Sequence, residues 1–129
     1  MKTYSAKASE IEKKWVLIDA TGLVAVPGGI DAHVHFDQDT ADGSVFCDDF
    51  ESGSRAAAAG GTTTIIDFII PNRNQSLLEA RDFWMNNAKK SVADYAFHMA
   101  VTWFGDQVKR EMAHVYRKDG IQSFKIFMA

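Results

Sequence analysis

The chain of 129 residues lacks several features that would place it in a specialised class of protein. Its only cysteine, Cys47, leaves no internal disulfide and is typical of a reducing compartment. The basic residues form no block and the net charge is −3, which disfavours nucleic-acid binding because phosphates need clustered lysine and arginine. No apolar run could span a bilayer, and the N-terminal segment MKTYSAKASEIEKKW resembles no signal peptide. These absences favour a cytoplasmic globular protein without nucleic-acid or membrane partners.

Short apolar segments alternate with helical segments along most of the chain. The later apolar segments are apolar on both faces, which is typical of a parallel sheet covered by helices. No glycine-rich phosphate loop opens a helix, which disfavours a nucleotide-binding Rossmann sheet. The alternation of strands and helices instead favours an α/β fold of the (β/α)8 barrel type. A complete barrel needs about 250 residues, so this chain can form only part of one. Strands are expected at 30–36, 62–70, 94–103 and 123–128, and helices at 49–59, 76–90 and 105–120.

Local sequence features predict where other elements begin and end. Asp48 or Asp49 is expected to cap the first helix, and the glycine pair 60–61 to stop it. Ser76 and Glu79 have the spacing of a capping box at the start of the second helix. The third helix should end at Gly120, after an apolar stripe of Val108, Met112, Val115 and Tyr116. Two earlier strands, 15–18 and 23–26, are expected on either side of a turn at Thr21 and Gly22.

The segment GGIDAHVHF, residues 28–36, carries two histidines, His33 and His35, on an expected strand. Side chains two residues apart on a strand point to the same face, so two neutral imidazoles about 6 to 7 Å apart could bind one metal ion. In a barrel, inward-facing residues near the C-terminal end of a strand lie at the active site. The pair alone is weak evidence for a metal site, because two such histidines are more often polar side chains near a loop.

Lys125 lies in the last expected strand, between Phe124 and Ile126. Alternation predicts that the two apolar neighbours face the helices and that Lys125 faces the barrel interior. A buried lysine is costly unless it is neutral or paired, and a neutral amine is nucleophilic. It could form a Schiff base, or react with carbon dioxide to give a carbamate that bridges two cations. A lysine that reaches solvent from an edge strand is an equally good interpretation of the pattern.

Three segments, GLVAVPGGIDAHVHF, DDFESGSRAAAAGGTTTIIDF and SFKIFMA, occur in this order and at family-like spacings. Together they resemble the dihydropyrimidinase/D-hydantoinase branch of the amidohydrolase superfamily, from about Ile18 to Ala129. The resemblance implies a metal-dependent (β/α)8 barrel with a small β-sandwich built from both chain ends. On this basis residues 1–27 are expected to be a remnant of the β-sandwich, and residues 28–129 the first half of the barrel.

The resemblance also implies a site with two zinc ions that hydrolyses cyclic amides. His33 and His35 would be ligands of the more buried zinc, and Lys125, carboxylated, would bridge both ions. Two zinc ions about 3.5 to 4 Å apart activate water and polarise a carbonyl, which would open a dihydropyrimidine or hydantoin ring to an N-carbamoyl amino acid.

Further residues receive roles by the same resemblance. Asp31 would support the ligands or the local structure, and Phe127 would line the substrate pocket. The loop 37–48 resembles the gate loop that selects the ring substituent, but it is unusually acidic, which leaves the substrate open. Asp67 could orient a ligand histidine or serve as a cap or loop residue. We assign no chemistry to the remaining candidates, which are a structural His98, an exposed His114 and an inert Cys47.

The family's oxyanion tyrosine, two further histidine ligands and its catalytic aspartate would follow Ala129. The chain is therefore expected to be an N-terminal fragment of a longer enzyme that forms homotetramers, and to be inactive alone. Two alternatives differ in class. One is a non-catalytic scaffold of the collapsin-response-mediator type, whose members lack the metal ligands. The other is an inactive truncated product, whose edge strands at 30–36 and 123–128 would pair with other chains or aggregate.

Overall fold

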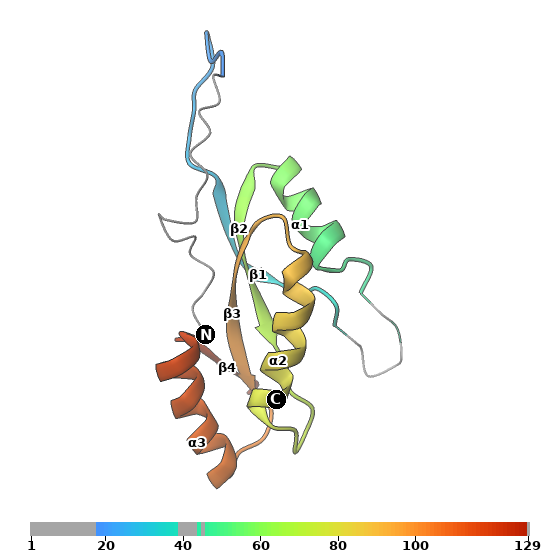
Figure 1. Ribbon diagram of the computed structural model, residues 1–129, viewed down its shortest axis with the longest axis vertical. Helices are drawn as coiled ribbons and strands as arrows, with labels where there is room; N and C mark the ends of the chain where they lie inside the picture. The colour runs from blue at the N-terminus through green and yellow to red at the C-terminus, as the bar shows by residue number, and fades with distance from the viewer. Residues whose placement is uncertain (1–17, 39–43, 45, 129) are drawn as a thin grey trace.

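The computed structural model describes residues 18–38, 44 and 46–128. Four parallel strands form one sheet in the order β1-β2-β3-β4, and a helix follows each of the first three (Figure 1). This confirms the predicted β-α alternation. The strands are β1 (Gly29–Val34), β2 (Thr62–Ile69), β3 (Asp94–Val101) and β4 (Phe124–Ile126). The helices are α1 (Phe50–Ala59), α2 (Leu77–Asn87) and α3 (Asp106–His114), and the short helices η1 (Ala88–Lys90) and η2 (Val115–Asp119) extend α2 and α3.

Two predicted strands differ from the structure, and a third lies almost entirely outside the described residues. Residues 23–26 form no strand, and residues 18–28 extend away from the sheet at the top of Figure 1. Leu23 and Val24 are 73% and 87% exposed, and a strand without a partner gains no ladder hydrogen bonds. The strand predicted at 15–18 lies outside the described residues except for Ile18, which is not in a strand. β4 is shorter than predicted because β3 pairs with it only through Met99–Val101.

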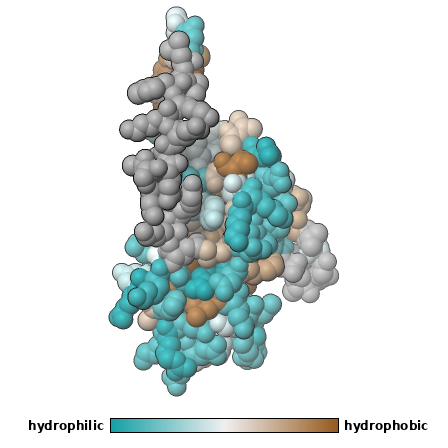
Figure 2. Space-filling view, viewed as in Figure 1, coloured by the Kyte–Doolittle hydropathy of each residue, from teal (hydrophilic) through white to brown (hydrophobic). Residues whose placement is uncertain are grey.

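One face of the sheet packs against the helices and forms the core. Alternate residues of β2, Ile65 and Ile69, are fully buried on this face. Met99 is likewise fully buried on β3, and Phe124 of β4 packs against the same cluster. The helices contribute Phe50, Leu77, Ala80, Trp84, Ala88, Val108 and Val115. Among the described strands β1 and β4 form the two edges of the sheet, and Ile30 of β1 and Ile126 of β4 are 69% and 72% exposed. In Figure 2 the lower part of the molecule, where α3 lies, is mostly hydrophilic.

The N-caps of α1 and α2 are residues that the sequence predicts. Asp49 caps α1: its carboxylate accepts from Ser52 N, and the Ser52 hydroxyl accepts from Asp49 N. Ser76 caps α2 by accepting from the backbone N–H groups of residues 78 and 79. The carboxylate that receives Leu77 N and the Ser76 hydroxyl, however, belongs to Glu111 of α3, at 2.7 and 3.0 Å. Ser76 therefore caps α2 as predicted, and a carboxylate from α3 binds the first turn of the helix in addition.

The end of α3 also differs in detail from its predicted apolar stripe. Val108 and Val115 are buried and Met112 is partly buried, but Tyr116 is 54% exposed. The chain turns π-helical at Val115, and the wider turn rotates Tyr116 away from the line of the other three residues. The turn ends at Gly120, whose φ of 75° is readily adopted by glycine.

Helix α1 approaches the core through a glycine. A Cβ atom built on Gly53 would lie 2.2 Å from Cε1 of the buried Phe36 ring. We therefore expect Gly53→Ala to lower the free energy of unfolding by about 1–3 kcal/mol, since the ring or the helix must move. Gly60→Ala is the matched control, because its nearest atoms lie at 3.5 Å. Urea midpoints of the two variants make the comparison, and equal midpoints would contradict close packing of α1 on Phe36.

Candidate metal centre

The face of the sheet opposite the helices carries two histidines and a lysine around one phenylalanine. Phe68 of β2 is only 6% exposed and lies at the middle of this group. The ring centroids of His33 and His35 lie 4.6 and 5.0 Å from that of Phe68. Lys125 Nζ lies 4.3 Å from the same centroid. Residues that are 90 positions apart in the chain are therefore brought together around one ring.

The two histidines face each other through the same ring nitrogen. His33 Nε2 lies 3.3 Å from His35 Nε2. Two such nitrogens either share a proton in a hydrogen bond or direct both lone pairs at one cation. Zn–N bonds of about 2.0–2.1 Å in a tetrahedral site place two nitrogens about 3.3–3.4 Å apart. The spacing therefore fits two ligands of one zinc ion. No group of three or more histidine, cysteine, aspartate or glutamate side chains suited to a metal occurs in the described part of the chain.

The surroundings of His35 favour its neutral form. Burial lowers the pKa of His35 below its ordinary value, and the nearby charges of Lys125 and His33 lower it further. A neutral imidazole has a free lone pair, which is the form that binds a metal ion. The environment of His35 therefore favours the form that can bind a cation.

A distortion of β1 lies next to the histidines. From Asp31 to Val34, three steps along β1 stand against two steps along β2, from Ile65 to Asp67. Asp31 Oδ1 accepts a hydrogen bond of 3.1 Å from His33 N within this bulge. Bulges near functional sites redirect side chains. The structure thus places Asp31 on the backbone of a predicted ligand.

Lys125 shares the face with the histidines, as alternation along the strand predicts. It is half-buried, and its Nζ lies 5.1 Å from the centroid of the Phe127 ring as well as above Phe68. Phe127 itself is 51% exposed. The amine nitrogen therefore lies between two aromatic rings, on the same face of the sheet as the histidines.

Asp67 lies on the helix-facing side of β2 and is fully buried. Its carboxylate accepts from Phe36 N at 3.2 Å and from Phe68 N at 2.6 Å. Burial raises the pKa of Asp67 to about 7, against the lowering effect of these two hydrogen bonds. Asp67 contacts the backbone that follows His35, so it connects β2 to the end of β1.

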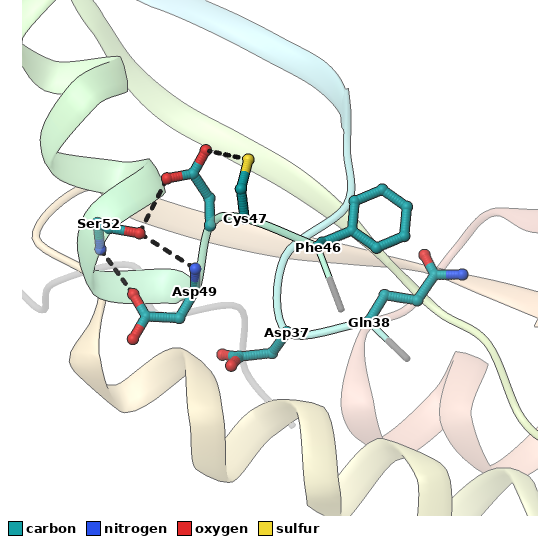
Figure 3. A pocket seen from close by; sticks show the side chains of 7 residues that line it. Asp37, Gln38, Phe46, Cys47, Asp49 and Ser52 are labelled. Atoms are coloured by element: carbon teal, nitrogen blue, oxygen red, sulfur yellow. Dashed lines mark hydrogen bonds between the residues drawn. The ribbon is translucent and has the colours of Figure 1, made fainter. Parts of the chain in front are cut away.

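The loop after β1 forms a cavity of about 400 Å³ at the start of α1 (Figure 3). Cys47 lies in it, is exposed, and its thiol donates to Asp48 Oδ2 over 3.6 Å. The cavity does not include the histidine pair, but the loop meets the site through Phe46, whose ring centroid is 6.1 Å from that of His35. The lining residues are Asp37, Gln38, Phe46, Cys47, Asp48, Asp49 and Ser52.

Two residues near the site had no predicted function. Phe68 lies in an apolar strand, where burial on both faces hides which side a residue occupies. His98, predicted to be structural, lies on the interior face with its ring centroid 4.7 Å from that of Phe68. The sequence indicated this face only through strand alternation, which puts His98 on the same side of β3 as Ala96 and Ala100. His114 is exposed as predicted, with its side chain 47% accessible on α3.

Comparisons with known proteins identify the family. Residues 24–123 match the amidohydrolase family, and the chain belongs to it. It is 53% identical over 114 residues to a dihydropyrimidinase of Dictyostelium discoideum, covering 88% of this chain and 22% of that protein. It is 50% identical over 114 residues to a D-hydantoinase of Geobacillus stearothermophilus, covering 88% of this chain and 24% of that protein.

The comparison with solved structures confirms the fold. A D-hydantoinase from Bacillus sp. AR9 superposes with a TM-score of 0.83 at 47% identity. The alignment covers 87% of this chain and 24% of that structure. The four parallel strands and three helices are therefore part of a (β/α)8 barrel, as predicted, and the chain spans less than a quarter of the length of these relatives. Within the described segments, no helix combines the length and apolarity needed to cross a membrane.

Proposed function

We propose that this chain contributes the first metal ligands of a zinc-dependent cyclic amidohydrolase, which opens a dihydropyrimidine or hydantoin ring to an N-carbamoyl amino acid. The observation that carries the proposal is the 3.3 Å separation of His33 Nε2 and His35 Nε2, with Lys125 on the same face of the sheet. Relatives named dihydropyrimidinase and D-hydantoinase, about 50% identical, support the reaction class.

In this proposal each residue has a chemical role. His33 and His35 act as neutral nitrogen donors, in keeping with the lowered pKa of His35. Lys125, between the rings of Phe68 and Phe127, reacts as a free amine with carbon dioxide. A C–N bond forms, one proton leaves to water, and the resulting carbamate offers two oxygens to a pair of cations. Two bound zinc ions supply Lewis acidity and lower the pKa of water. Phe127 lines the substrate pocket, and Asp31 holds His33 through its backbone.

The test is metal content and turnover of the complete gene product. The wild-type protein is expected to bind two zinc ions and to hydrolyse dihydrouracil or hydantoin. His33→Ala combined with His35→Ala should lose zinc and reduce turnover at least about 10³-fold, because the more buried zinc loses both nitrogen ligands and the reaction loses its Lewis acid. His114→Ala, on the outer face of α3, is the matched control and should retain both properties.

Full activity of the double variant would overturn the assignment. A wild-type protein that binds no zinc would instead agree with a non-catalytic scaffold. The proposal also includes a cytoplasmic location for the protein. It further includes an assembly of four copies, which sedimentation of the purified gene product would measure.

A further inference from the structure

We infer that His98 is a positioning residue for the metal ligands, because its imidazole ties the β1 bulge to the segment that begins β4. This inference rests on the proposed function. His98 Nε2 lies 3.0 Å from the carbonyl oxygen of Ala32, the residue before His33. His98 Nδ1 makes a short hydrogen bond with the hydroxyl of Ser123, two residues before Lys125. One side chain of β3 thus reaches both strands that carry predicted ligands.

The partners of His98 define the tautomer of its neutral ring. A carbonyl oxygen only accepts, so Nε2 carries a hydrogen and donates to Ala32. In the neutral imidazole Nδ1 is then an acceptor, and the Ser123 hydroxyl donates to it. Both ring nitrogens are engaged, which leaves neither free to bind a metal. His98 therefore acts on the site through the backbone and not as a ligand.

The bulge in β1 explains why a side chain is needed at this point. The mismatch between Asp31 and Val34 interrupts the regular pairing of β1 with β2 where Ala32 and His33 lie. Asp31 fixes the N–H of His33, and His98 fixes the carbonyl of Ala32. The peptide unit that joins Ala32 to His33 is thus held at both its oxygen and its nitrogen, so two hydrogen bonds fix the backbone from which the His33 side chain projects.

At the other end, the Ser123 segment is held twice by β3. Met99 N donates to the Ser123 carbonyl over 3.0 Å, and His98 binds the Ser123 hydroxyl. β4 has only three residues, so these contacts contribute much of what sets the height of Lys125 along the sheet. The Phe68 ring packs against His33, His98 and Lys125, so a displacement of one of these side chains is transmitted to the others through the ring.

The experiment measures zinc affinity, and the visible spectrum of the protein loaded with Co²⁺, in the complete gene product. Loss of a group that orients metal ligands lowers metal affinity about 10- to 100-fold. We expect His98→Gln to lower zinc affinity by an amount within this range. Ser123→Ala should lower it about tenfold, at the lower end of the range. Both variants should shift the Co²⁺ ligand-field bands, which report ligand geometry and which a residue that only stabilises the fold would not move. His114→Gln is the matched control and should leave affinity and spectrum unchanged.

The outcomes separate this inference from the proposed function. Wild-type zinc affinity and an unchanged Co²⁺ spectrum in both His98→Gln and Ser123→Ala would overturn the positioning role while leaving the metal site intact. A wild-type protein that binds neither metal would overturn the proposed function, and the inference with it. If His98→Gln fails to fold, Ser123→Ala decides, because it removes a single hydroxyl from an exposed residue.

Discussion

Lys125→Met is expected to abolish hydrolysis by the complete gene product, lowering kcat by about 10³-fold or more, since loss of a single electrostatic stabiliser already costs 10²–10³. Methionine keeps an unbranched chain of similar length against Phe68 and Phe127, so the packing around residue 125 is preserved. What disappears is the amine, and with it the carbamate that would bridge two cations. The loss should appear in kcat together with the loss of bound zinc.

Intact mass measured at neutral pH makes the chemical step visible. The wild-type protein, incubated with bicarbonate, should gain the mass of one carbon dioxide, and Lys125→Met should not. Lys109→Met, an exposed position of α3, is the control and should keep both the adduct and the turnover. Undiminished turnover in Lys125→Met would show that the lysine bridges nothing, even if the histidine pair binds metal.

The arrangement of His33, His35 and Lys125 on one face could be predicted from strand periodicity. His33 near the end of β1 and His35 just after it are two residues apart and share a side, and Lys125 alternates with Phe124, which packs into the core. Parallel pairing could also be predicted, since β2 and β3 are apolar on both faces. Helix ends were predictable where the partner is local, as at Asp49 with Ser52. The binding of Glu111 to the first turn of α2 was not, because it depends on a contact across 34 residues.

The remaining features depend on tertiary geometry that leaves little trace in the sequence. The bulge at Ala32 and His33 arises from a register shift between β1 and β2, and no residue type there requires it. The use of His98 depends on that bulge, since it binds the carbonyl that the bulge presents. Phe68 is one apolar residue among many in β2, and only the fold shows that it lies beneath both histidines and the lysine. The sequence predicts that Asp67 either orients a ligand histidine or serves as a cap or loop residue. In the structure its carboxylate accepts hydrogen bonds from two backbone N–H groups.

Asp67→Asn is expected to remove a pH dependence of stability from the protein. Burial raises the folded-state pKa of Asp67 to about 7, from an ordinary value of 3.8. The folded protein then binds the proton more tightly than the unfolded chain, so stability falls as pH rises through the window between these values. Below pH 3.8 both states are protonated, and above about 7 the folded protein carries the full cost of a buried carboxylate. At 1.36 kcal/mol per unit, that cost is about 4 kcal/mol.

Urea midpoints between pH 4 and 8 measure the effect. Relative to wild type, Asp67→Asn should gain stability steadily up to pH 7 and then level off, because the amide accepts from Phe36 N but carries no charge. Asp94→Asn, at the exposed start of β3, is the matched control and should follow the wild-type profile, since its carboxyl stands in solvent. Parallel profiles for wild type and Asp67→Asn would mean that the carboxylate is ionised at low cost. In that case the two N–H donors, and not burial, would have the larger effect on the pKa of Asp67. The contact between β2 and the end of β1 would then involve a charged carboxylate.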